Sequence, residues 1–278
     1  MKVILIPTDF SENARNATLY ALSSFNLEKD RFILLNSYTI PSTGRSAIMT
    51  DLTADMRREA KRDLYREKEE LVELCGQSAE KIEIVTELGD LTSVINCIRD
   101  TYEIDYVVMG TKGASGFEEV FIGSNAYDVV RDVECPVIIV PENAKFQKQS
   151  KIVFAADFTK IDDTVVLLPL INFVKENKAE LHIVNVLSKE DDHETEKSIE
   201  KMRLKKYFEA IENHKFHTFK DVSVAEGIDK YVKSVDADLL VMLARKNGFF
   251  DSIFRTKVTR KVVLHTSVPV LVLHDKKS

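Results

Sequence analysis

The chain has few of the residues that form disulfides or bind metals, and it lacks the long apolar runs that cross membranes. Its three cysteines, Cys75, Cys97 and Cys135, are odd in number, far apart and without a C-x-x-C pair. Free thiols in a reducing cytoplasm fit this pattern better than disulfides or a zinc site. No apolar segment approaches the length that spans a bilayer. The apolar run at residues 2–7 is too short for a signal peptide, so a cytoplasmic location is expected.

Histidine is absent from the whole first half of the chain. All six histidines lie from His182 to His274. A Ser-His-Asp or Cys-His mechanism within the first half is therefore excluded, and no catalytic residues are predicted. The closest pair, His214 and His217, matches no known metal-ligand pattern in its surroundings. No metal site is predicted.

An excess of positive charge is also missing. Lys and Arg number 39 against 45 Asp and Glu, which gives a formal charge of -6. The sequence therefore has no basic footprint for nucleic acid, and neither nucleic acid nor a membrane is expected as a partner. A length of 278 residues with 44% hydrophobic residues indicates a soluble protein of two domains.

The chain contains one pattern twice. Three pairs of segments match, namely residues 2–11 with 151–159, 105–109 with 238–242 and 135–140 with 268–273. The offset is 148 residues between Asp9 and Asp157 but 133 residues in the later segments, so the second copy is shorter by 15 residues in its middle. We predict two homologous domains, 1–143 and 151–278, joined by a polar linker.

Apolar runs alternate with helical patterns in the first half. The predicted strands are Val3–Ile6, Phe32–Leu35, Ile82–Thr86, Tyr106–Met109 and Val137–Val140. Helices are expected after a Ser11 cap, over 56–74 and after an Asp90 cap, and residues 41–55 are expected to be a loop. Continuous Val- and Ile-rich strands are typical of parallel sheets covered on both faces. The fold class is therefore α/β, with a doubly wound parallel five-stranded sheet in each half and the strand order 3-2-1-4-5.

The most informative segment lies between the fourth strand and the helix that follows it. Gly110, Gly113, Gly123 and Ser124 stand there at G-x2-G-x9-G-S spacing. Glycines let the backbone turn tightly and approach a ligand, and a helix N-terminus attracts phosphate oxygens. Ser124 is predicted to cap that helix and to offer its hydroxyl to the same anion. The segment predicts phosphate binding.

Asp9 follows the first strand, beside the fourth strand in the predicted order. Ligands in such sheets bind outside the carboxyl ends of the strands, so Asp9 and the glycine segment would share one crevice. Asp9 either contacts a ribose or adenine or serves as a turn residue before the Ser11 helix, and both roles can hold at once. Lys112 either touches a terminal phosphate or is a solvated lysine. The spacing alone does not require that the ligand carry a base.

The second half departs from the glycine pattern. Its aligned residues are Leu243 for Gly110, Lys246 for Gly113, Thr256 for Gly123 and Lys257 for Ser124. Side chains thus stand where bare backbone would approach a phosphate. We predict a degenerate second copy that stabilises or adapts the first.

These motifs together resemble the universal stress protein family in its tandem two-domain form. The resemblance rests on Pro7-Thr8-Asp9, on the glycine-serine pattern from Met109 and on Cys135-Pro136. It implies an adenine nucleotide alpha hydrolase-like fold that binds ATP or ADP, with Mg²⁺. The residues it places around the nucleotide are Pro7, Thr8, Asp9, a residue near Asn36 or Ser37, Met109, Gly110, Lys112, Gly113, Gly123, Ser124 and Asn125. It also implies that the two halves pair as an internal pseudo-dimer, and it leaves a further homodimer open.

Three functions are compatible with these features. The resemblance implies a protein of the stress response in which the nucleotide is a structural or regulatory ligand. A dedicated ATPase is disfavoured because the sequence has no G-x-x-x-x-G-K-[ST] loop and no acidic residue placed for a metal, which leaves weak ATP hydrolysis. The third function is an interaction module without a small ligand, against which the complete glycine pattern counts. The sequence identifies no protein partner.

Overall fold

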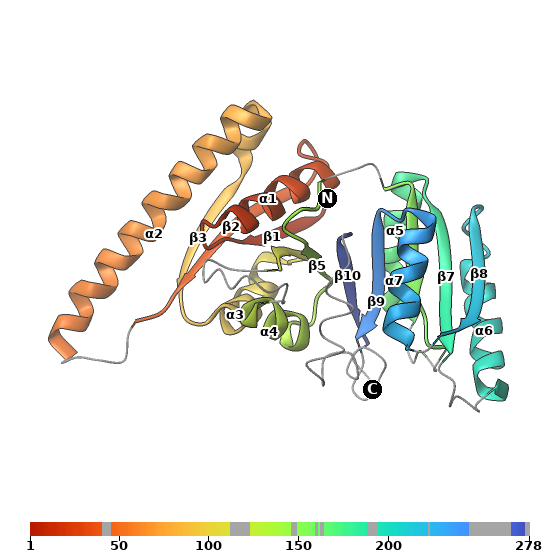
Figure 1. Ribbon diagram of the computed structural model, residues 1–278. Coiled ribbons are helices and arrows are strands. Elements are labelled where there is room, and N and C mark those ends of the chain that lie inside the picture. The colour runs from red at the N-terminus through yellow and green to blue at the C-terminus, as the bar shows by residue number, and fades with distance from the viewer. Residues whose placement is uncertain are drawn as a thin grey trace. The chain divides into compact units, whose positions relative to one another are not determined.

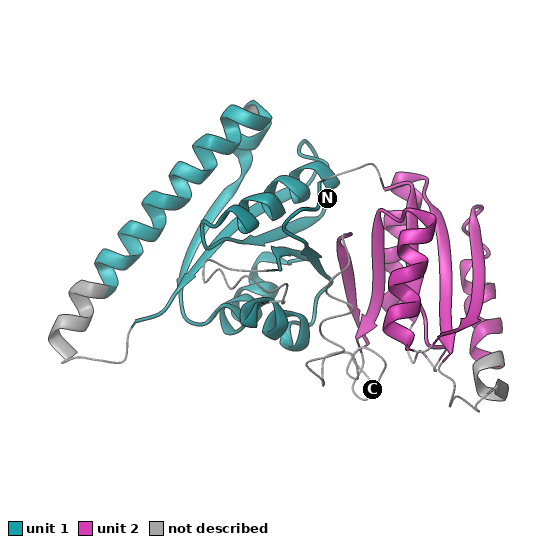
Figure 2. Cartoon of the chain, viewed as in Figure 1, with its two compact units in different colours: residues 1–117, 123–146 teal, residues 118–122, 147–278 magenta. Residues whose placement is uncertain are grey.

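The computed structural model describes two compact units, each with its own sheet. The described residues are 1–40, 46–111, 123–145, 149–158, 161, 164–187, 194–221, 223–244 and 268–275. Residues 1–117 and 123–146 belong to the first unit, and the second unit includes everything from 147 onward (Figure 2).

The first unit is built on five parallel strands. They are β1 (Val3–Pro7), β2 (Arg31–Tyr38), β3 (Glu83–Leu88), β4 (Tyr106–Gly110) and β5 (Val137–Val140). Their pairing runs β3-β2-β1-β4-β5. Every residue of β1, β4 and β5 is buried, as expected of central strands covered on both faces. The predicted α/β class with a doubly wound parallel sheet is confirmed.

Four helices cover this sheet on its two faces. They are α1 (Glu12–Ser24), α2 (Ser46–Cys75), α3 (Leu91–Tyr102) and α4 (Ser124–Asp132), and a short 3₁₀ helix (Gln77–Lys81) follows α2. An ion pair between Arg15 and Glu70 joins α1 to α2. Helices α3 and α4 pack against each other on the other face (Figure 1). Both faces of the sheet are therefore buried, in agreement with its apolar strands.

Two predicted helix caps are confirmed. The Ser11 hydroxyl oxygen accepts a hydrogen bond from the Ala14 amide at 3.2 Å, and Asp90 accepts one from the Ser93 amide at 3.0 Å. Each cap satisfies an amide that has no partner within its own helix. These contacts fix where α1 and α3 begin, directly after β1 and β3.

The predicted loop over 41–55 is wrong for most of its length, because α2 already begins at Ser46. The buried residues of helix α2 include Ala60, Leu64, Glu67 and Leu71, which recur at helical spacing. A glutamate within this otherwise apolar stripe is unusual. The turn residues at 41–44 led the prediction to extend the loop too far, although 46–55 contains no proline or glycine.

The second unit repeats this architecture. Its strands are β6 (Lys151–Ala155), β7 (Glu180–Leu187), β8 (His214–Lys220), β9 (Leu239–Ala244) and β10 (Val270–His274), all parallel, in the order β8-β7-β6-β9-β10. Its helices are a 3₁₀ helix (Thr164–Leu167), α5 (Leu168–Asn177), α6 (Glu194–Phe208) and α7 (Val224–Val235). The strand order within the second unit is thus the same as within the first.

The length difference between the halves lies in one helix. Helix α2 has 30 residues and α6 has 15. Their last residues, Cys75 and Phe208, are 133 positions apart, as are the later segments of the repeat. Their first residues, Ser46 and Glu194, are 148 positions apart, so the 15 residues missing from the second copy fall within this helix. The predicted pairing of the two halves as a pseudo-dimer stays a prediction.

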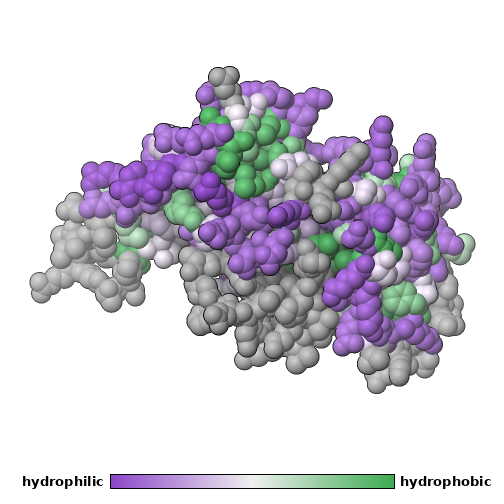
Figure 3. Space-filling view, turned by 45° about the horizontal axis from the view of Figure 1, so that its top comes forward, coloured by the Kyte–Doolittle hydropathy of each residue, from purple (hydrophilic) through white to green (hydrophobic). Residues whose placement is uncertain are grey.

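The surface is mostly polar on the face that Figure 3 shows, where apolar residues gather in small groups. Within the described parts of the chain, no helix is both long enough and apolar enough to cross a bilayer.

Candidate functional site

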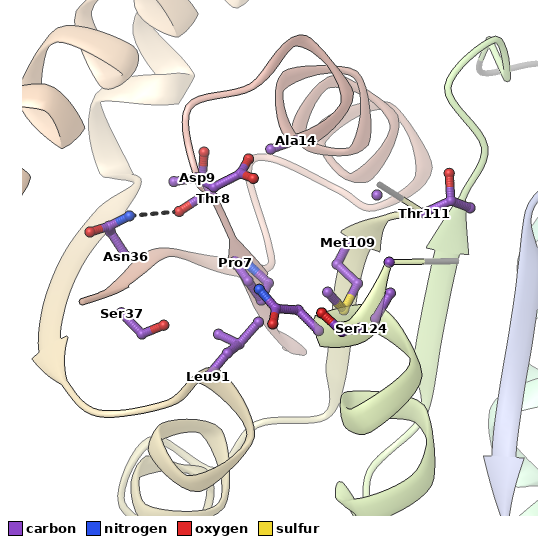
Figure 4. A pocket seen from close by; sticks show the side chains of 14 residues that line it. Pro7, Thr8, Asp9, Ala14, Asn36, Ser37, Leu91, Met109, Thr111 and Ser124 are labelled. Atoms are coloured by element: carbon purple, nitrogen blue, oxygen red, sulfur yellow. Dashed lines mark hydrogen bonds between the residues drawn. The ribbon is translucent and has the colours of Figure 1, made fainter. Parts of the chain in front are cut away.

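A pocket opens in the first unit at the carboxyl ends of its central strands (Figure 4). It holds about 670 Å³ of space, which includes open solvent at its mouth. The lining residues come from the ends of β1, β2 and β4 and from the starts of α3 and α4, with one residue of α1. They are Pro7, Thr8, Asp9, Ala14, Asn36, Ser37, Leu91, Met109, Gly110, Thr111, Gly123, Ser124, Asn125 and Ala126.

Thr8 is fixed by four hydrogen bonds on the β1 side of the pocket. Its amide donates to the Leu35 carbonyl at 2.8 Å, and its carbonyl accepts from the Asn36 side-chain amide at 2.8 Å (Figure 4). Its hydroxyl donates to Glu67 Oε2 at 3.0 Å and accepts from the Phe10 amide at 3.1 Å. Every polar atom of this 6% exposed residue is engaged, so this side of the pocket is rigid.

Asp9 lies exposed at the lip of the pocket. Its Oδ1 accepts hydrogen bonds from the Ser11 amide at 3.2 Å and the Ser11 hydroxyl at 2.6 Å. This is the turn role that the sequence suggested for Asp9. Because Asp9 also lines the pocket, contact with a ligand remains compatible with that turn. Phe10 completes the turn with a φ of 63°, which is uncommon for a residue with a side chain.

Gly110 ends β4 and also lies directly beneath α1. A Cβ at this position would stand 1.8 Å from Asn13 Oδ1 and 3.0 Å from the Asn13 carbonyl oxygen. A glycine is therefore needed here for packing between helix and strand, whatever the pocket binds. The sequence interpretation, which assigned this glycine to phosphate approach, missed this second reason.

The start of α4 forms the opposite side of the pocket. The prediction that Ser124 caps this helix is wrong, because Gly123 occupies the N-cap position and Ser124 is the first helical residue. The Gly123 carbonyl accepts from the Tyr127 amide at 3.0 Å, and the Gly123 amide donates to the Thr111 carbonyl at 2.6 Å. The amides of the first helical turn have no partner within the helix and carry the positive end of its dipole. Ser124 and Asn125 are thus suited to an anion through their backbone amides.

Few ionisable groups line the described part of the pocket. Asp9 is the single ionisable side chain among the described lining residues. Glu67 lies behind Thr8 and is 9% exposed. Burial raises the pKa of Glu67, while the hydrogen bond from Thr8 and the charge of Arg15 oppose that shift. An anionic ligand would therefore be held by backbone amides and hydroxyl groups of the described residues.

Nine of the residues proposed from the sequence line this one pocket, as does Asn36, the alternative to Ser37. They are Pro7, Thr8, Asp9, Ser37, Met109, Gly110, Gly123, Ser124 and Asn125. Lys112 and Gly113 lie outside the described residues. The sequence interpretation missed Ala14, Leu91, Thr111 and Ala126. Leu91 and Ala126 could have been found, since each belongs to the first turn of a helix that follows a strand end.

The sequence as a whole matches one family model twice. The universal stress protein family is matched at residues 1–141 and again at 149–274, which is nearly the whole chain. The chain belongs to the universal stress protein family. The two matches agree with the two compact units and with the repeat found in the sequence.

Individual relatives support the same assignment. Universal stress protein MJ0531 of Methanocaldococcus jannaschii is 26% identical over 148 residues, which are 52% of this chain and 84% of that protein. Universal stress protein MJ0577 of the same organism is 25% identical over 152 residues, or 50% of this chain and 94% of that protein. The crystal structure of a universal stress protein from Archaeoglobus fulgidus has a TM-score of 0.70 and 22% identity, with 98% of both chains covered. This last likeness shows the tandem fold alone.

The corresponding place in the second unit is packed differently. Asn185 donates to the Ala156 carbonyl at 2.8 Å, as Asn36 does to Thr8, so the residue that corresponds to Ser37 is Val186. Val186 is 5% exposed, and a Cβ on Gly227 of α7 would stand 2.6 Å from its Cγ1. Helix α7 thus lies close against the end of β7. An apolar contact replaces the polar lining that Ser37 gives the first unit.

Four side chains of the second unit form a cluster between β7, β8 and α7, and it includes two of its histidines. The His182 and His217 rings stack at 5.5 Å, and His182 Nδ1 lies 2.8 Å from the Tyr231 hydroxyl. Glu180 lies 3.3 Å from His182 Nε2. His214 is an odd number of positions from His217 on one strand, so the two point to opposite faces. Across the described residues, no group of three or more His, Cys, Asp or Glu could hold a metal ion.

Proposed function

We propose that the first unit binds an adenine nucleotide, ATP or ADP with Mg²⁺, as a structural or regulatory ligand in a stress response. The observation that carries the proposal is the pocket itself. It brings the Pro7-Thr8-Asp9 turn and the start of α4 to the carboxyl edge of one parallel sheet. Parallel α/β sheets bind nucleotides at this edge.

The lining residues fit the two ends of a nucleotide. The backbone amides of Ser124 and Asn125 would receive phosphate oxygens at the N-terminus of α4, with the helix dipole in favour of the negative charge. Asp9 and Ser37 would accept or donate hydrogen bonds at the ribose and base. Because Asp9 is the sole carboxylate of the described lining, Mg²⁺ would be held chiefly by phosphates and water. The metal would offset the charge of the phosphates.

Calorimetric titration of the nucleotide-stripped chain with ATP and Mg²⁺ tests this function. We expect submillimolar affinity and one nucleotide per chain. The matched variant is Gly123→Thr with Ser124→Lys, which introduces the residues found at the aligned positions of the second half. Gly123 has a φ of -59°, and threonine is a good N-cap residue, so this variant should fold. We expect it to bind nucleotide more weakly, because the two larger side chains would stand where phosphate oxygens approach the backbone amides at the start of α4.

The reverse exchange, Thr256→Gly with Lys257→Ser, is the control and should bind one nucleotide as the parent chain does. A stoichiometry near two in the parent chain would contradict the assignment of the site to the first unit alone. A folded parent chain that binds no nucleotide would refute the proposal and favour the interaction module. Release of inorganic phosphate during long incubation with ATP would identify a weak hydrolase.

A further inference from the structure

Glu67 is a buried carboxyl group on a helix whose other buried residues are mostly apolar. It stands between Leu64 and Leu71 in the buried stripe of α2, and its exposed fraction is 9%. Burying a carboxylate is unfavourable unless it is paired or hydrogen-bonded. Its Oε1 has no hydrogen-bond partner among the residues that the structure describes. A methionine or leucine at this position would avoid the cost of burying a carboxylate.

What Glu67 does contact is the pocket. Its Oε2 accepts the Thr8 hydroxyl at 3.0 Å, and that hydroxyl accepts the Phe10 amide at 3.1 Å. This chain of hydrogen bonds holds the residues on both sides of Asp9. The Phe10 amide that this chain of hydrogen bonds reaches belongs to a residue with a left-handed φ of 63°. Loss of the carboxyl group would free the Thr8 hydroxyl and loosen the turn that presents Asp9.

The second unit offers a natural comparison. Glu200 lies 133 positions after Glu67 on α6 and is 5% exposed. Its Oε1 accepts from the Ile161 amide at 3.3 Å, and its Oε2 pairs with Arg203 at 3.0 Å. Ala156 stands where the first unit has Thr8, so no hydroxyl is available there. A carboxyl group is thus buried in both halves, but in the first half alone does it hold a residue of the pocket.

We propose that Glu67 is a positioning residue of the nucleotide site, which acts through Thr8 to fix the Asp9 turn in its binding conformation. This inference rests on the nucleotide-binding function proposed above. Rigid presentation of Asp9 lowers the conformational cost of binding. Glu67 itself lies outside the pocket lining.

Replacement of Glu67 separates positioning from stability. Glu67→Met removes the acceptor but retains the length of the side chain, and apolar replacements of buried charges are often neutral or stabilising. We expect the midpoint of thermal unfolding of Glu67→Met to stay the same or rise. Its nucleotide dissociation constant should rise about tenfold, as expected from loss of one charged hydrogen bond that orders the site. Glu67→Gln keeps an acceptor for the Thr8 hydroxyl and should bind within about threefold of the parent chain.

Glu200→Met is the matched control and should leave the nucleotide dissociation constant unchanged. The parent chain is titrated in parallel, and its failure to bind would refute the nucleotide function itself. If the parent chain binds and Glu67→Met binds equally well, the positioning role of Glu67 is refuted. Equal weakening by Glu67→Gln and Glu67→Met would also refute it, because the hydrogen-bond acceptor would then be irrelevant. If Glu67→Met does not fold, Thr8→Val takes its place in the comparison, because it removes the hydroxyl that donates to Glu67. Glu67→Gln again serves as the variant that retains the hydrogen bond.

Discussion

The two units share a strand order but differ at the carboxyl ends of their strands. At the opposite edge of the sheet they are alike. Asp105 accepts from the Val3 amide at 2.7 Å, and Asp238 accepts from the Lys151 amide at 2.9 Å. These contacts fix the start of the first strand in each half. They are scaffold contacts, because they lie at the amino ends of the strands and the pocket lies at the carboxyl ends.

Some features of the pocket edge are also present in both halves. Phe10 and Phe158 both have left-handed backbones, with φ values of 63° and 52°. Asn36 and Asn185 both donate to the carbonyl of the residue that directly follows the first strand of their unit. Since the second half lacks the glycine pattern, these features serve the fold of the turn. Asn36 is therefore a structural residue of the pocket edge first and a lining residue second.

The features found in one half alone identify the site more sharply. Gly110 is replaced by Leu243, Thr8 by Ala156, and Ser37 by Val186, which packs beneath Gly227. Each replacement puts an apolar side chain where the first unit has a glycine or a hydroxyl-bearing residue in the pocket lining. The comparison thus separates residues that build the sheet from residues that build the pocket, within a single chain.

The largest effect should come from Gly110→Ala. The added methyl group would overlap the Asn13 side chain, and such overpacking costs about 1–3 kcal/mol of unfolding free energy. Nucleotide binding should fall with it, because α1 must move. Chemical denaturation and calorimetry would measure both effects.

A double-mutant cycle tests the cause. Asn13→Ala removes the atoms that the new methyl group would meet, so the double variant should be less destabilised than the sum of the single variants. Strict additivity would mean that the contact with Asn13 does not cause the loss of stability.

Mild acid should destabilise the second unit and not the first. Burial lowers the pKa of His182 below its ordinary value of 6.5, so His182 stays neutral in the fold. The stability it contributes is complete above pH 6.5 and is lost as the pH falls toward the lowered pKa, by up to about 1.4 kcal/mol per pH unit. His217, Glu180, Lys215 and Tyr231 face this ring from β7, β8 and α7.

The first unit contains no histidine and should respond in the opposite direction. Burial raises the pKa of Glu67, so protonation of Glu67 as the pH falls removes a buried charge and stabilises the fold. Hydrogen exchange at pH 7.5 and pH 5.5 would follow each unit separately. His182→Gln should reduce the acid effect, and His214→Gln, on the opposite face of β8, should not. Equal protection of both units at both pH values would contradict the difference.

The smallest effect concerns the shared asparagines. Asn36→Ala and Asn185→Ala each remove one buried hydrogen bond to a backbone carbonyl, and each should cost about 1 kcal/mol of unfolding free energy. Unfolding in urea would measure the two costs. A large cost at Asn36 with none at Asn185 would mean that the two units do not use this residue alike.

Sequence alone determined the architecture. Continuous apolar runs, cap residues and the repeated segments depend on local composition and periodicity, so α/β class, tandem organisation and most strand bounds could be predicted. The start of α2 could not, because residues 46–55 have a weak helical pattern beside strong turn signals. The N-cap of α4 was misassigned by one position, since serine and glycine are both accepted there.

The tertiary structure decided what the residues of the pocket contact. The spacing of the glycines indicated a phosphate site, but nothing in it could reveal that Asn13 of α1 lies against Gly110. Likewise, Glu67 is 59 positions from Thr8, and only the packing of α2 beside the end of β1 brings the two together. Sequence periodicity reports which face of an element is buried. The partners that meet there are set by how the elements pack, because such contacts join segments that are far apart in the chain.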